Sequence, residues 1–149
     1  MQLQKETQTA RFESVHHQAI VNVLHTYNWC SDKLKQTVLP YDITIQQFNV
    51  LRILRGQYPD PSTVSLLKAR MLDKMCDASR IVDRLVQKGL IVKDGNAQDK
   101  RAVDVMISDK GLDLLDRMDQ EVSVSDLISA NLTEKEAQQL NMLLDKMRG

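Results

Sequence analysis

The 149 residues of this chain are enough for one domain, and a hydrophobic fraction of 42% can fill a packed core. No apolar run approaches the roughly 20 residues of a membrane span, and the N-terminal residues lack the apolar segment of a secretory signal. Two cysteines are too few for a disulfide framework, so we expect a cytoplasmic protein with no membrane partner.

The net charge is zero, but it is unevenly distributed along the chain. Residues 1–61 carry six Lys or Arg against five Asp or Glu, and residues 102–149 carry five against ten. Residues 62–101 carry nine bases against five acids, so the basic excess lies in one short segment. A local positive field of this kind attracts phosphate, although a charged face is often only a solvated face.

Apolar residues at three- and four-residue steps predict a first helix from near Thr9 to near Thr37. Thr44, with Gln47 three residues later, has the spacing of a capping box and opens a second helix. Residues 56–62 (GQYPDPS) form the densest cluster of turn formers in the chain. A short third helix is expected after it, from about Val64 to Arg70.

A fourth helix is predicted over residues 73–88, with Asp73 as its N-cap and Gly89 as a left-handed C-cap. Two strands follow at 90–93 and 102–107, and the polar turn between them reads DGNAQDKR. A helix that ends at glycine and leads into a hairpin with a basic tip is typical of a winged helix-turn-helix. Such a module places a helix in the major groove of DNA and a loop beside it.

Two further helices complete the prediction. Ser108 caps a long helix whose apolar stripe runs from Leu112 to Val122 and extends toward Ile128, and Thr133 with Glu136 forms a second capping box before the last helix. The first helix and the last two carry apolar stripes that need a partner. Either they pack on the helix-turn-helix itself, or they form an isologous homodimer, which also matches palindromic DNA.

The predicted fold class is therefore mainly α, a winged helix-turn-helix with a small antiparallel β-hairpin wing and long flanking dimerisation helices. The helix-turn-helix module spans residues 41–108, and the dimerisation helices span 1–40 and 109–149.

The run SRIVDRLVQKGLIVKDGNAQDKRAVDVMISDKGLDLL resembles the multiple-antibiotic-resistance-regulator (MarR) family of bacterial transcription factors. The matching motifs are VDRL (82–85), KGLI (88–91), DKR (99–101) and ISDKG (107–111), in this order and spacing. The resemblance covers essentially the whole chain, because the flanking helices have the lengths of that family's dimerisation arms. It implies a homodimer that releases double-stranded DNA when it binds a small aromatic effector or when a cysteine is oxidised.

The candidate DNA contacts lie on the third and fourth helices and on the wing. Arg80 is the candidate for a base edge, because a bidentate Arg–guanine pair is the commonest specific contact. Arg101, at the hairpin tip, can enter a narrow minor groove, and Asp99 is expected to hold its guanidinium, as the resemblance also implies. The remaining candidates for phosphate or base contacts are Lys68, Arg70, Lys74, Met75, Asp77, Ser79, Arg84, Lys93 and Lys100.

Several of these residues have a purely structural alternative. Asp99 and Arg101 would form an ordinary surface ion pair, and Asp77 would only stabilise the start of a helix. Arg84, beside Asp83, would make a structural ion pair or a phosphate contact instead of reading a base. Lys68 and Arg70 would only face solvent.

The sensor candidates are His16, His17, Tyr27, Trp29 and Cys30 on the first helix, together with Cys76. Packing in the core or at a dimer interface is the alternative for the first five. Cys76 is expected in the first turn of the fourth helix, where the helix dipole favours a thiolate, so we hypothesise that its oxidation weakens DNA binding. The histidines and cysteines do not have the spacing of a metal site, and no metal or cofactor is expected.

The sequence contains no Gly-rich phosphate loop, GxSxG or HExxH motif, so neither a catalytic residue nor an enzymatic activity is expected. The prediction is a sequence-specific DNA-binding transcriptional regulator, acting as a ligand- or redox-responsive repressor. The alternative is a winged-helix module that binds proteins without touching DNA. Such a module has no need of Arg80 and Arg101 on one face.

Overall fold

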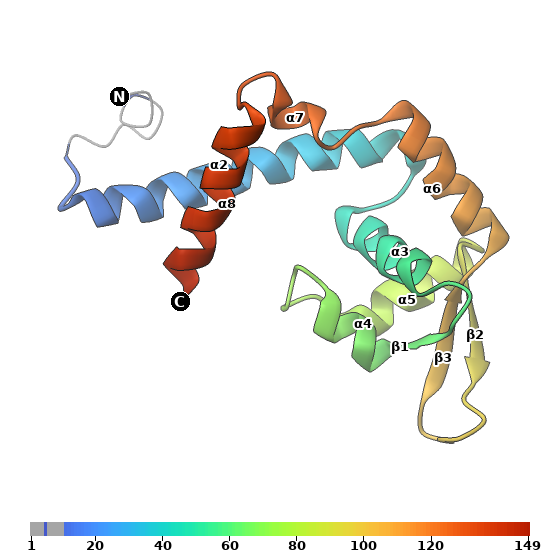
Figure 1. The fold of residues 1–149 in the computed structure, drawn as a ribbon. Coiled ribbons are helices and arrows are strands. Elements are labelled where there is room, and N and C mark those ends of the chain that lie inside the picture. The colour runs from blue at the N-terminus through green and yellow to red at the C-terminus, as the bar shows by residue number, and fades with distance from the viewer. Residues whose placement is uncertain (1–4, 6–10) are drawn as a thin grey trace.

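The computed structural model describes residue 5 and residues 11–149, and Figure 1 shows a small sheet and short helices from which a long helical arm departs. The helices are α2 (Val15–Val38), the 3-10 helix η1 (Leu39–Tyr41), α3 (Ile45–Gln57), α4 (Val64–Arg70), α5 (Ala78–Gln87), α6 (Asp109–Glu121), α7 (Asp126–Ser129) and α8 (Glu134–Arg148). The strands are β1 (Ser62–Thr63), β2 (Ile91–Gly95) and β3 (Val103–Ile107).

The core lies between α3, α4, α5 and the sheet. Aliphatic side chains fill it, since residues of this kind gain about 1.5–3 kcal/mol each when they are fully buried. The buried side chains include Val50, Leu51 and Leu54 of α3, Leu67 of α4, Val82 and Leu85 of α5, Ile91 of β2, and Val105 and Ile107 of β3. Leu115 and Met118 of α6 join the same core, so this helix is anchored to the module.

The sheet has the order β1-β3-β2, and both pairs are antiparallel. The predicted hairpin is confirmed, with Ile91 opposite Ile107 and Gly95 opposite Val103. The pairing of Ser62 with Val105, which forms β1, was not predicted. This strand is only two residues long and follows the cluster of turn formers, so it has no alternating apolar pattern of its own.

Among the flanking helices, two boundaries differ from the sequence prediction. α2 begins at Val15, because the side chain of Ser14 accepts from the backbone N–H of His17 (3.1 Å) and caps the helix there. Thr9, the predicted start, lies outside the described residues. α6 ends at Glu121, since Val122 is extended, and Ile128 therefore belongs to the separate helix α7 instead of continuing the stripe of α6.

The helical arms expose much of their apolar surface. Val38 is the buried residue of α2, and α8 has none. Figure 1 shows α2 leaving the helix-turn-helix as a long arm, with α7 and α8 beyond the far end of α6. None of the helices in the described part of the chain combines the length and hydropathy that a membrane span requires.

α5, the wing and α6 meet at one junction, formed by Gly89, Leu90, Ser108 and Gly111. Gly89 adopts φ 71°, which lets the chain reverse after α5. The backbone N–H of Ser108 donates to the carbonyl of Leu90 (3.0 Å), and its hydroxyl donates to the carbonyl of Gly89 (2.6 Å). Gly111 lies so close that a Cβ atom there would be 2.3 Å from the carbonyl oxygen of Leu90.

We expect Gly111→Ala to lower the free energy of unfolding by about 1–3 kcal/mol, because the added methyl group collides with backbone that cannot move aside. Gly56→Ala is the matched control, since a Cβ at Gly56 meets nothing within 4 Å. This change should raise the free energy of unfolding by about 0.5–1 kcal/mol, as for alanine replacing glycine within a helix. Urea unfolding measures both, and equal effects would contradict the close approach at Gly111.

Candidate nucleic-acid interface

The helix that carries the DNA-contact candidates begins later than predicted. Asp77, not Asp73, is the N-cap of α5, because its carboxylate accepts from the backbone N–H of Arg80 (3.1 Å). The carboxylate of Asp73 instead accepts from the N–H of Met75 (2.9 Å) and closes a turn. Lys74 and Met75 therefore lie in the turn between α4 and α5, and not on the helix as predicted.

The new start of α5 also moves Cys76 out of the first helical turn. Its thiol donates to the carbonyl of Asp73 (2.9 Å) and lies 3.3 Å from the sulfur of Met71. Cys76 therefore lacks the helical position on which the prediction of a reactive thiolate depended.

α5 presents opposite faces to the core and to solvent. Ala78, Val82 and Leu85 are buried, whereas Ser79, Arg80, Asp83 and Arg84 are exposed. The neighbouring candidates Lys68, Arg70, Lys74, Lys100 and Arg101 are exposed as well. Within the described part of the chain, neither Arg80 nor Arg84 nor any of these five residues takes part in an ion pair. Their positive charges are therefore available to an external anion.

The tip of the wing is held by side-chain contacts to its own backbone. The side-chain oxygen of Asn96 accepts from the N–H groups of Gln98 (2.9 Å) and Asp99 (2.8 Å). The carboxylate of Asp99 accepts from the N–H of Arg101 (2.9 Å). Asp99 thus fixes the backbone that carries Arg101, and no ion pair joins the two side chains among the described residues. Asn96 was not among the predicted candidates, although asparagine is typical of such turns.

An ion pair connects the wing to α5. The ammonium group of Lys93 on β2 lies 2.5 Å from the carboxylate of Asp83 on α5. Asp83 therefore pairs with Lys93 and not with Arg84, the partner considered from the sequence. Because this contact joins the two elements that carry Arg80 and Arg101, it helps to fix their relative positions.

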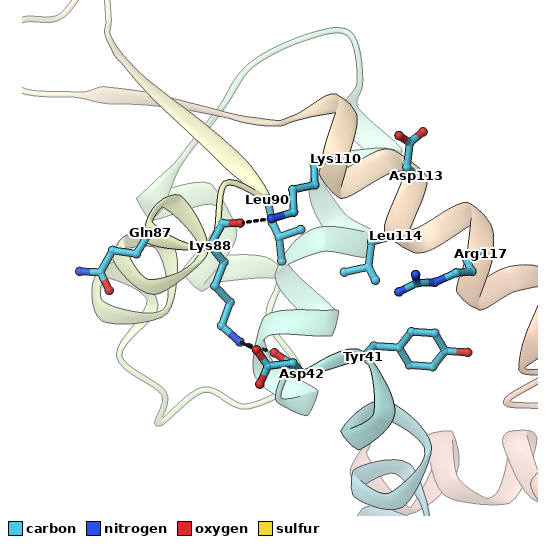
Figure 2. A pocket seen from close by; sticks show the side chains of 9 residues that line it. All are labelled: Tyr41, Asp42, Gln87, Lys88, Leu90, Lys110, Asp113, Leu114 and Arg117. Carbon is cyan, nitrogen blue, oxygen red and sulfur yellow. Dashed lines mark hydrogen bonds and ion pairs between the residues drawn. The ribbon is translucent and has the colours of Figure 1, made fainter.

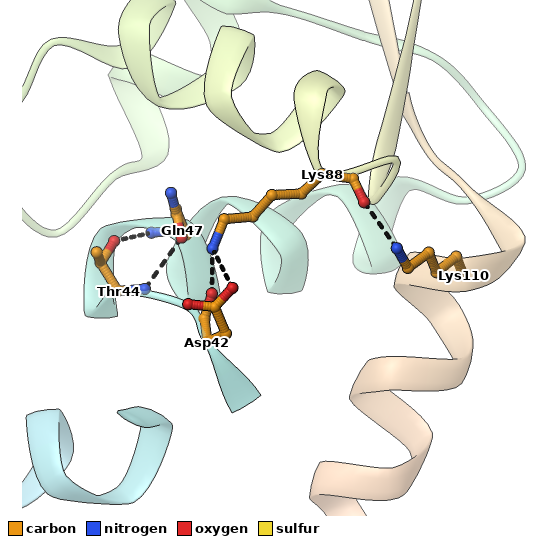
Figure 3. Close-up of polar contacts among 5 residues, drawn as sticks. All are labelled: Asp42, Thr44, Gln47, Lys88 and Lys110. Carbon is orange, nitrogen blue, oxygen red and sulfur yellow. Dashed lines mark hydrogen bonds and ion pairs between the residues drawn. The ribbon is translucent and has the colours of Figure 1, made fainter. Parts of the chain in front are cut away.

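A second link holds the C-terminal end of α5 (Figure 3). The ammonium group of Lys88 donates to the backbone carbonyl of Asp42 and lies 3.3 Å from its carboxylate. Asp42 has φ 53°, in the corner between η1 and α3, next to the confirmed capping box of Thr44 and Gln47. Lys110 of α6 donates to the carbonyl of Lys88 (2.9 Å), so α5 is tied to both flanking elements.

A cavity of about 620 Å³ opens beside this link, between η1, the end of α5 and α6 (Figure 2). Its lining residues are Tyr41, Asp42, Gln87, Lys88, Leu90, Lys110, Asp113, Leu114 and Arg117. The guanidinium of Arg117 lies 5.4 Å from the centre of the Tyr41 ring. The hydroxyl of Tyr41 donates to the carboxylate of Glu121 (2.6 Å), and this bond raises the pKa of Tyr41 above its usual value.

A second cavity of about 630 Å³ shares Asp42, Gln87 and Lys88 with the first and is also lined by Arg80 and Arg84. The sensor candidates of α2 line neither cavity: His16, Tyr27 and Trp29 are exposed, and His17 and Cys30 are partly buried on the arm.

The arrangement of a helix-turn-helix, a wing and long helical arms agrees with comparisons to known proteins. A model described as "MarR family" matches residues 43–103. The Multiple antibiotic resistance protein MarR of Escherichia coli (strain K12) is 34% identical over 129 residues, which cover 84% of this chain and 88% of that protein. The chain belongs to the MarR family. It is therefore a DNA-binding transcription regulator and not an enzyme.

Solved structures support the same assignment. A mutant of E. coli MarR in complex with operator DNA matches this regulator with a TM-score of 0.73 and 31% identity, covering 85% of this chain and 91% of that one. An organohalide-sensing regulator bound to 2,4-dichlorophenol matches with a TM-score of 0.77 and 22% identity, covering 94% of this chain and 85% of that one. BpsR of Bordetella bronchiseptica, whose DNA binding is regulated by 6-hydroxynicotinic acid, matches with a TM-score of 0.71 and 20% identity, covering 89% of this chain and 99% of that one. The last two show a shared fold.

Asp77→Ala should lower the free energy of unfolding by about 0.5–2 kcal/mol, because it removes the cap of α5. Amide hydrogen exchange locates the effect: exchange at Arg80 should accelerate, since its N–H loses its acceptor. Asp73→Ala is the matched control and should accelerate exchange at Met75 while Arg80 stays protected. The opposite pattern would restore Asp73 as the cap.

Proposed function

We propose that this MarR-family regulator is a repressor that binds palindromic double-stranded DNA as a homodimer. The observation that carries the proposal is the set of exposed basic side chains on α4, α5 and the wing that have no ion-pair partner among the described residues. Such side chains gain counterion-release free energy when they meet phosphate, and they give up no internal ion pair. The E. coli relative solved with operator DNA gives independent support.

Within this proposal, α5 enters the major groove and Arg80 contacts a base edge, while Arg101 on the wing tip enters the neighbouring minor groove. Ser79 and Arg84 lie on the same exposed face of α5. Lys68, Arg70, Lys74 and Lys100 contact phosphates. Lys93 has a weaker claim, because Asp83 already neutralises its charge. Two copies of α5 would read half-sites about 10–10.5 base pairs apart.

Arg80→Ala should weaken DNA binding by about 1–3 kcal/mol and relax the preference at one base pair of each half-site. Arg101→Ala should weaken binding as well. The binding constants are measured on a duplex that the full-length protein selects from a randomised pool, and on duplexes with single base-pair changes.

Arg148→Ala on α8 is the charge-matched control and should leave DNA affinity unchanged, because Arg148 lies outside the proposed interface. Equal weakening of Arg80→Ala on every duplex would assign Arg80 to phosphate. Unchanged affinity of Arg101→Ala would exclude the wing tip from the complex.

The homodimer is supported by the apolar surface of the arms. Ile20 and Leu24 on α2, and Leu140, Leu143 and Met147 on α8, are exposed although they repeat at helical spacing. An apolar stripe of this kind usually covers another surface. Two-fold pairing through α2 and α8 would bury both stripes and place the two α5 helices on the same side.

Leu143→Glu should dissociate the dimer, because two-fold symmetry places two carboxylates in the apolar contact. The free-energy cost of burying each unpaired charge is far larger than the gain from burying the leucine. We expect the dimer dissociation constant to rise by at least about tenfold, as measured by sedimentation equilibrium. Val92→Glu is the control: Val92 is also exposed (52%) but lies on the wing, so this variant should remain dimeric. A monomeric wild-type chain at micromolar concentration would contradict the proposal.

We further propose that a small aromatic effector regulates DNA binding, since one protein of the same fold binds 2,4-dichlorophenol and the DNA binding of another is regulated by 6-hydroxynicotinic acid. The cavity beside Tyr41 offers apolar side chains, Leu90 and Leu114, next to the cations of Lys110 and Arg117. These groups suit a ring that carries an acidic substituent. The sensor candidates on α2 would contact an effector only at a cleft completed by the dimer; they are His16, His17, Tyr27, Trp29 and Cys30. Oxidation of Cys76 is the alternative signal.

A further inference from the structure

The turn between α4 and α5 exposes two apolar side chains. Met75 is 94% exposed and Leu72 is 86% exposed, more than any other large hydrophobic side chain among the described residues. They lie three residues apart in a segment that otherwise contains Asp73, Lys74 and Cys76. One turn thus carries two exposed apolar side chains that the helix-turn-helix does not use internally.

This surface is presented by a well-defined turn. The N–H of Leu72 donates to the side-chain oxygen of Asn49 on α3 (3.1 Å), and the N–H of Met75 donates to the carboxylate of Asp73 (2.9 Å). Both backbone donors are therefore satisfied by side chains. The buried residues Met71 (1% exposed) and Ala78 (3% exposed) anchor the turn at its two ends. The backbone of this turn therefore directs Leu72 and Met75 outward.

The charges around the turn favour a polyanion as its partner. Lys68 and Arg70 at the end of α4, Lys74 in the turn and Arg80 in the first turn of α5 are exposed and have no ion-pair partner among the described residues. The carboxylates of Asp73 and Asp77 each accept from a backbone N–H group. An apolar tip with a basic rim is complementary to a groove whose walls are phosphates.

We propose that Met75, assisted by Leu72, recognises thymine through its C5-methyl group in the major groove. This methyl group is the apolar feature that distinguishes thymine on the major-groove edge. The turn directly precedes α5, so it would reach the bases next to those read by Arg80. The inference rests on the proposed DNA-binding function and adds a specificity-determining contact to it.

The test replaces single thymines by deoxyuridine, which removes only the methyl group. The duplex is one that the full-length protein selects from a randomised pool. The wild-type protein should bind about fourfold more weakly for each half-site in which the recognised thymine is replaced, as expected for one buried methyl group. Met75→Ala should bind the thymine and deoxyuridine duplexes almost equally, and Leu72→Ala should show an intermediate ratio.

Each protein is compared with itself on the two duplexes, so a general folding defect cancels in the ratio. Met75→Leu should retain most of the discrimination, because leucine also offers a large apolar surface. Leu39→Ala is the control, since Leu39 is 74% exposed but lies on η1, and this variant should keep the wild-type ratio.

The inference is overturned if Met75→Ala keeps the wild-type discrimination, or if no thymine in the selected duplex shows a methyl effect with the wild-type protein. In both cases DNA binding itself is retained, so the proposed function survives. Failure of the protein to select any sequence overturns both. If Met75→Ala changes the number of protein copies in the assembly but keeps the wild-type ratio of thymine to deoxyuridine binding, the side chain belongs to a contact between protein copies instead.

Discussion

The close contact between Gly111 and the carbonyl of Leu90 is the constraint on which the relative positions of α5, the wing and α6 depend. No side chain fits between them, so the first turn of α6 lies directly against the reversal that follows α5. Ser108 completes the contact, because its hydroxyl donates to the carbonyl of Gly89 while it accepts from the N–H of Gly111. α5, the wing and α6 therefore share one point of attachment.

Two polar links extend this constraint outward. Lys93 and Asp83 join the wing to α5, and Lys88 and Asp42 join the end of α5 to the corner between η1 and α3. The first link joins consecutive elements and the second joins residues 46 positions apart, and both lie at the surface, where ion pairs are weak individually. These links act on position, because they limit how α5 can rotate relative to α2. A ligand in the cavity beside Lys88 would meet this linkage directly.

The sequence predicted the features that depend on local chemistry. The capping boxes at Thr44 and Thr133, and the left-handed Gly89, are confirmed because each requires only residues within a few positions. The predicted N-cap of α5, Asp73, was wrong, since Asp73 and Asp77 have equivalent local signals. The choice between them depends on how the turn packs on α3. The links of Lys88 and Lys93 and the cavities were not predictable, because each joins residues that only the tertiary fold brings together.

The uneven charge along the chain has a kinetic consequence. The helix-turn-helix segment is basic, whereas residues 102–149 carry ten acids against five bases. A local excess of positive charge attracts phosphate even where the net charge of the whole molecule is zero, and it raises the rate of encounter with a polyanion. Between exposed charges this attraction extends over about a Debye length, roughly 8 Å at physiological ionic strength. Zero net charge is thus compatible with fast capture, and it limits indiscriminate adhesion to other anionic surfaces.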